Sequence, residues 1–125
     1  MTTLERTIWM HLLRLGVPTS LHGYHMLKSA IKLVYVNPKI AYQATTELYP
    51  AIEQEYETNS HRVERNIRHA VEYVFSNTDL EVLHEYFGNT TSVSKSKLTN
   101  TQFICGVVEY IRMTEGEWKE SHKNS

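Results

Sequence analysis

Several features that define whole classes of protein are missing from this sequence. Cys105 is the single cysteine among 125 residues, which excludes an internal disulfide and a zinc site built on cysteines. No stretch approaches the roughly 18 consecutive apolar residues that a membrane helix needs. The first residues lack the small-residue cleavage pattern of a secretory signal. Together these absences predict a cytoplasmic protein with no membrane segment.

Motifs for catalysis and for cofactor binding are missing as well. None of the five glycines belongs to a glycine-rich phosphate loop, and neither a nucleophile elbow nor an HExxH motif occurs. His22 and His25 are spaced for one face of a helix, but a metal site needs more than two ligands. We therefore expect neither an enzyme nor a metal or cofactor site.

The overall charge gives no sign of a nucleic-acid partner. Thirteen Lys and Arg residues stand against 14 Asp and Glu residues, for a formal net charge of −1. Any DNA site must therefore be a local patch, which makes the distribution of charge along the chain more informative than its sum. The length and the composition fit one ordinary globular domain.

Helical periodicity recurs along the chain, whereas the alternation typical of strands never persists. The apolar spacing predicts helices over residues 4–15, 21–36, 39–48, 50–56, 60–75, 79–87 and 99–113. We predict an all-α fold, a compact bundle of six to seven helices over residues 1–114. Residues 115–125 are predicted to form a polar, flexible tail. The longest break, residues 88–100, reads GNTTSVSKSKLTN and is expected to be an exposed loop.

The helix predicted over residues 60–75 concentrates charge on one side. At about 100° per residue, its apolar arc contains Val63, Ile67, Ala70, Val71 and Val74. The opposing arc contains His61, Arg62, Arg65, Arg68, His69 and Glu72. Since the apolar arc must pack on the domain, the arginine arc must face outward. Glu64 lies one turn before Arg68, where the two side chains can pair, and Asn59 or Ser60 can cap the helix.

A short helix is predicted immediately before this charged helix, after which comes a polar break of three or four residues. This order is that of a helix-turn-helix, whose second helix enters the major groove of DNA. Arginine can bond to O6 and N7 of guanine together, and glutamate can accept from N4 of cytosine. However, the turn has no glycine, and a charged helix face is often only a solvated one. Periodicity alone leaves both interpretations open.

Four segments, in order and at matching spacing, are similar to one protein family. The segment HRVERNIRHAVE resembles that family's recognition helix, S-R-V-E-R-A-I-R-H-A-I-E. The other three segments are LGVPTSLHGYHMLKSAIKLVY, LYPAIEQEYET and FGNTTSVSKSKLTNTQFI. Over about residues 8 to 113, the chain thus resembles the DNA-binding effector domain of the stage-zero sporulation response regulators.

This resemblance implies a transcription regulator that binds TGTCGAA-like promoter boxes in double-stranded DNA. Matched by position, Glu64, Arg65 and Arg68 would read the bases. Contacts to the DNA backbone are implied for Ser60, His61, Arg62, His69, Lys95, Lys97, Thr99 and Asn100. Lysines and helix N-termini both favour anions, which agrees with these positions. For Lys95 and Lys97, solvated loop lysines remain an equal alternative.

The resemblance also implies protein partners. Two copies on tandem boxes would sit head to tail and touch through the first and last helices. The family's contact with the sigma subunit of RNA polymerase would involve exposed residues among Glu81, His84, Glu85 and Phe87. The alternative for Leu83 and Phe87 is a plain packing role.

Some features depart from the family pattern. A full member carries an N-terminal phosphoacceptor receiver domain, whereas this sequence is expected to hold the effector half alone, as a separated domain or as a natural protein. His61, Asn66 and Leu98 stand where the family has serine, alanine and proline. The acid-rich stretches EQEYE and EGEWKE, with the near-zero net charge, support a second hypothesis. In that hypothesis the chain kept the fold but lost the phosphorylation switch. It would be either a protein-interaction module that also lost DNA affinity or a competitor that blocks boxes used by a full-length relative.

Overall fold

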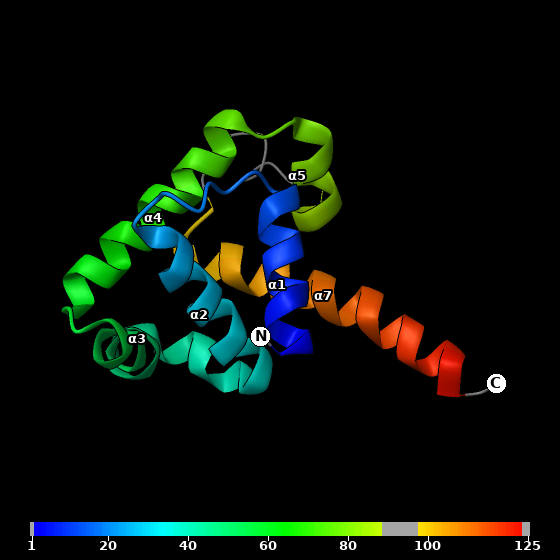
Figure 1. Ribbon diagram of the computed structural model, residues 1–125, viewed down its shortest axis with the longest axis horizontal. Helices are drawn as coiled ribbons and strands as arrows, with labels where there is room; N and C mark the ends of the chain where they lie inside the picture. The colour runs from blue at the N-terminus through cyan, green and yellow to red at the C-terminus, as the bar shows by residue number, and fades with distance from the viewer. Residues whose placement is uncertain (1, 89–97, 124–125) are drawn as a thin grey trace.

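The described residues form helices that pack around one central helix, α2. The computed structural model describes the backbone of residues 2–88 and 98–123 and the side chains of residues 2–88 and 98–115. In order, the helices are α1 (Thr3–Arg14), α2 (Gly23–Val36), η1 (Pro38–Gln43), η2 (Ala44–Leu48), α3 (Tyr49–Tyr56), α4 (Ser60–Asn77), α5 (Leu80–Phe87) and α7 (Asn100–Lys123). Helix α2 packs against α1, α3, α4 and α7 (Figure 1). With six α-helices and no strand in the described ranges, the prediction of an all-α bundle is confirmed.

One predicted helix, over residues 39–48, has a different geometry. It consists of a 3-10 helix, Pro38–Gln43, followed by a π-helix, Ala44–Leu48. The N–H of Tyr49 donates to the carbonyl oxygen of Ala44, which is the wider bonding pattern of a π-helix. The two pieces lead into α3 without a break and leave Leu48 and Tyr49 buried.

The apolar face of α4 is fully built into the core. All five residues of its predicted apolar arc are buried, at 0–2% exposure. Its charged arc is exposed throughout, as the periodicity predicted. The large, fully buried side chains outside α4 are Phe103, Ile8, Leu12, Leu15, Leu27, Ile31, Leu48, Ile52, Ile104 and Ile111. The face that carries the arginines is therefore backed by the most buried part of the domain.

The C-terminal helix is longer than the sequence indicated. Helix α7 continues to Lys123 and includes residues 115–123, which the sequence analysis assigned to a polar tail; its end projects away from the other helices (Figure 1). The domain boundary at residue 114 stays a prediction. Lys95 and Lys97 lie outside the described residues. Among the helices that are described, none has the length and apolarity to cross a membrane.

Candidate nucleic-acid interface

Helices α3 and α4 are joined by a tight turn over residues 57–59. Glu57 adopts the left-handed conformation, with φ 50° and ψ 49°, which glycine usually supplies. Asn59 then caps α4, because its side-chain oxygen accepts from the N–H of Arg62 at 2.9 Å. The hydroxyl of Ser60 donates instead to Oε2 of Glu53 on α3, at 2.6 Å. These contacts fix where α4 starts and tie it to α3.

The cap gives a first prediction. Replacing Asn59 with alanine should lower the free energy of unfolding by about 1 kcal/mol, because the N–H of Arg62 loses its acceptor. Chemical unfolding followed by circular dichroism measures this loss. Gln54→Ala, at an exposed position on α3, serves as the control. An unchanged Asn59→Ala variant would show that the side chain does not cap α4.

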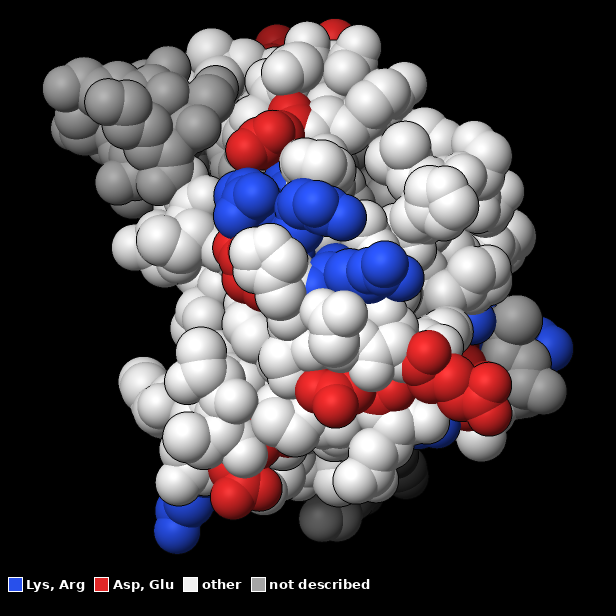
Figure 2. Space-filling model, turned by 90° about the vertical axis from the view of Figure 1, so that its left-hand side faces the viewer, with Lys and Arg blue, Asp and Glu red and all other residues white. Residues whose placement is uncertain are grey.

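The outward face of α4 carries a row of three arginines, Arg62, Arg65 and Arg68, all exposed. His61 and His69 are exposed on the same helix. Figure 2 shows basic side chains gathered at the centre of this face, with acidic side chains above and below them. Among the described residues, neither Arg62 nor Arg65 has an ion-pair partner. Their guanidinium groups are therefore available to an external anion or a base edge.

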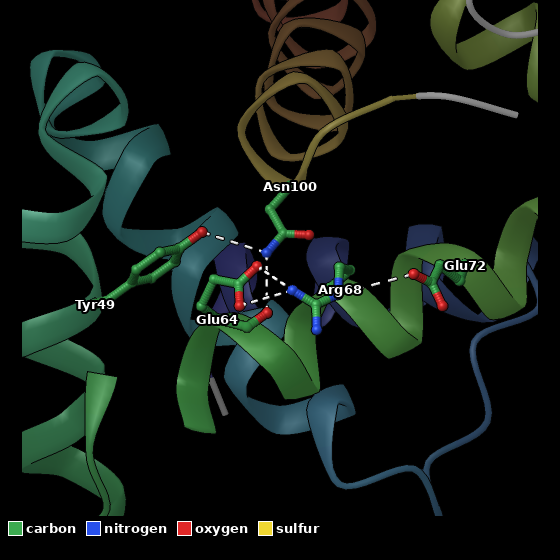
Figure 3. A network of polar contacts seen from close by, with 5 residues as sticks. All are labelled: Tyr49, Glu64, Arg68, Glu72 and Asn100. Atoms are coloured by element: carbon green, nitrogen blue, oxygen red, sulfur yellow. Dashed lines mark hydrogen bonds and ion pairs between the residues drawn. The ribbon is translucent and has the colours of Figure 1, made fainter. Parts of the chain in front are cut away.

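Arg68 differs from the other two arginines because it lies between two carboxylates (Figure 3). Its Nη1 donates to both side-chain oxygens of Glu64, at 2.7 and 2.9 Å. Its Nε lies 3.8 Å from Oε1 of Glu72, one turn further along α4. The ion pair expected from the spacing of Glu64 and Arg68 is thus confirmed. It holds the Arg68 guanidinium along the surface of the helix.

The start of α7 meets α4 through a buried amide. Asn100 is only 8% exposed, and its Nδ2 donates to the main-chain oxygen of Glu64 at 3.0 Å. The same nitrogen donates to the hydroxyl of Tyr49 on α3 at 3.3 Å (Figure 3). Burial raises the pKa of the Tyr49 hydroxyl above its usual value, so that it stays protonated. The Asn100 side chain thus joins three helices instead of facing solvent.

A capping box closes the N-terminal start of α7, next to this amide. The Thr99 hydroxyl accepts from the N–H of Gln102 at 3.1 Å, and the Gln102 side chain accepts from the N–H of Thr99 at 2.9 Å. The N–H groups of Asn100 and Thr101 have no acceptor among the described residues. Gln102 could have been found from its T-x-x-Q pattern, whereas Tyr49 has no local signal. The start of α7 therefore has two backbone N–H groups, beside α4, that no described residue accepts from.

The remaining candidates lie away from this face or inside the domain. Asn66 is half-buried, with Nδ2 3.8 Å from the sulfur of Met26, so it does not extend the charged arc. On α5, Leu83 is buried, and the ring of Phe87 lies 5.0 Å from that of Phe103, so the packing role is confirmed for both. In the part of the chain whose side chains are described, no three potential ligands gather as a metal site would require.

Comparison with known protein families identifies this arrangement. The family model described as "Sporulation initiation factor Spo0A C terminal" matches residues 8–111, which include α2, α3, α4 and α5 entirely. It is a family of DNA-binding domains that act in sporulation and transcription regulation, not a family of enzymes. The match also spans the turn before α4 and the start of α7. The chain therefore belongs to the family of C-terminal, DNA-binding domains of the sporulation initiation factor Spo0A.

Proposed function

We propose that this domain binds TGTCGAA-like boxes by inserting α4 into the major groove, with α3, the turn and α4 acting as a helix-turn-helix. One observation carries the proposal: the exposed arginine row lies on a helix whose opposite face is fully buried. A rigidly held helix can present side chains to base edges in one register. The tight turn and the Asn59 cap support the same role for α4.

The proposed residue roles are those that the family resemblance implies, and the exposure and pairing of the described residues support some of them. Arg65 and Arg68 read base edges, while Glu64 accepts from a base or holds Arg68 in place. Arg62, His61 and His69 contact phosphates on either side of the groove. Lys95, Lys97 and the start of α7 at Thr99 and Asn100 contact a second stretch of backbone. The side chains of Ser60 and Asn100 already bond within the domain, so these two residues act through the N–H groups at the starts of α4 and α7.

Replacing Arg65 with alanine tests base reading. The variant should lose about 1–3 kcal/mol of discrimination between a TGTCGAA-like duplex and a scrambled one, because the bidentate hydrogen bond of Arg65 to a base is lost. Equilibrium binding to both labelled duplexes at two salt concentrations measures it. Arg6→Ala, an exposed arginine on α1, is the matched control and should bind like the wild type.

The opposite result has a clear meaning. Weak binding that is equal for both duplexes, insensitive to salt and unchanged by Arg65→Ala would reject DNA recognition by α4. The charged face would then be a solvated surface, and the second hypothesis, a protein-interaction module, would replace the first. A steep salt dependence without sequence preference would instead indicate contacts to phosphates alone.

The proposal extends to two protein partners. On tandem boxes, two copies sit head to tail and touch through α1 and α7. Exposed apolar side chains on these helices support this contact: Trp9, Met10 and Leu13 on α1, and Met113 on α7. On α5, the exposed carboxylates of Glu81 and Glu85 are the proposed contacts to the sigma subunit of RNA polymerase.

A further inference from the structure

Two separate parts of the fold face DNA in the proposed function, and one buried side chain joins them. These parts are the arginine row of α4 and the start of α7. A groove of about 360 Å³ lies between them, lined by Arg68 and Glu72 from α4, by Thr101 from α7 and by Thr99, which directly precedes α7. Asn100 belongs to this groove as well, and its amide is the hydrogen-bonded link across it.

The start of α7 suits a phosphate for two physical reasons. The aligned peptide dipoles of a long helix place a partial positive charge of about half a unit at its N-terminus. In addition, the N–H groups of Asn100 and Thr101 donate to no described residue. A phosphate bound there fixes the position of the domain on the duplex, since phosphate contacts set register and orientation. A phosphate contact at α7 can place α4 correctly over the bases only if the two helices keep a fixed position relative to each other.

Apolar packing alone does not fix the position of α7 relative to α4 well. The contact between α4 and α7 includes the rings of Phe75 and Phe103, whose centres lie 6.2 Å apart, and burial of apolar surface is not directional. A hydrogen bond, in contrast, weakens steeply when its angle departs from linear. The Asn100 amide donates to the main chain of α4 at Glu64, the residue whose carboxylate holds Arg68. The bond thus connects α7 to the backbone of the residue that pairs with Arg68, one of the proposed base-reading residues.

We propose that Asn100 is a positioning residue for DNA recognition: its amide sets the start of α7 against α4, so that phosphate and base contacts form together. This inference rests on the proposed function, because it presupposes that α4 reads bases. It assigns to the Asn100 side chain a role that involves no contact with DNA. Loss of the amide lets the two surfaces shift, and the phosphate contact at α7 then no longer fixes the register of α4.

The test compares Asn100→Ala with Tyr49→Phe. Tyr49→Phe removes the hydroxyl that accepts from Asn100 but leaves the bond between α7 and α4, so it serves as the matched control for lost stability. Both variants are measured against box and scrambled duplexes over a series of salt concentrations. Circular dichroism selects a temperature at which each variant is folded. The slope of log K against log salt counts the phosphate contacts, at about 0.9 for each one.

For Asn100→Ala we expect a slope shallower by about one contact and a preference for the box reduced at least about fivefold. Tyr49→Phe should keep the wild-type slope and preference even where its thermal stability is lower. A wild-type slope and preference in Asn100→Ala would overturn the inference. An equal loss in both variants would overturn it too, because the network would then act only as a stabiliser.

The same experiment separates this inference from the proposed function. If the wild-type chain shows no preference for the box, or Arg65→Ala leaves that preference intact, base reading by α4 fails and the inference fails with it. If the wild type prefers the box through Arg65 and Asn100→Ala does not differ from it, only the positioning role is lost.

Discussion

Replacement of Gly23 with alanine is expected to lower the free energy of unfolding by about 3 kcal/mol or more. Gly23 starts α2, directly against the middle of α4. A Cβ atom at this position would lie 2.0 Å from the main-chain oxygen of Asn66 and 2.7 Å from its carbonyl carbon. Because both are backbone atoms, no side-chain rotation can relieve the clash. The two helices would have to move apart, and the gap would disturb the packing of Ala70, whose Cβ is 3.3 Å away.

Chemical unfolding monitored by circular dichroism measures the loss. His22→Ala is the matched control, since His22 is exposed and makes no capping hydrogen bond, and it should change the stability by less than about 0.5 kcal/mol. In a second comparison, Gly106→Ala would meet the ring of Phe87, a side chain that can turn, so its loss should be smaller. A Gly23→Ala variant as stable as the wild type would rule out the close approach of α2 and α4.

Gly23 also shows what the sequence could predict and what it could not. The periodicity of residues 60–75 correctly gave the buried and exposed sides of α4, because one repeat of 3.6 residues decides both. The close approach of Gly23 to Asn66 joins residues far apart in the chain, and no local pattern indicates it. For the same reason, no local pattern indicates that Asn66 lies half-buried against α2.

At the ends of helices, the residue types alone did not decide which side chain caps the helix or which residue forms the turn. Asn59 and Ser60 are both good caps, and only the contact of Ser60 with Glu53 on α3 decides between them. The absence of glycine from the turn favoured a solvated face over a helix-turn-helix in the sequence, but Glu57 adopts the left-handed conformation that glycine usually supplies. Asn100 was assigned to a phosphate-contacting region through the family resemblance, and its burial against Tyr49 and Glu64 depends on the packing of three helices.

The second large effect is expected for Ile67→Ala, at the centre of the apolar face of α4. Ile67 is 0% exposed, and truncation leaves a cavity between α4 and its neighbours. The expected loss is about 2–5 kcal/mol in the free energy of unfolding, from lost burial and the unfilled volume. Chemical unfolding measures it, with Arg65→Ala as the control on the same helix. Arg65 is exposed and unpaired among the described residues, so its truncation should cost less than about 0.5 kcal/mol.

Together, Ile67→Ala and Arg65→Ala separate the two faces of one helix. Ile67→Ala should lose stability but keep its preference for the box under conditions in which it remains folded, because its side chain faces away from the DNA. Arg65→Ala should keep stability and lose the preference. If Ile67→Ala, while folded, lost the preference as Arg65→Ala does, the core behind α4 would set base reading as directly as the arginines. If Ile67→Ala were as stable as the wild type, the packing described for α4 would be wrong.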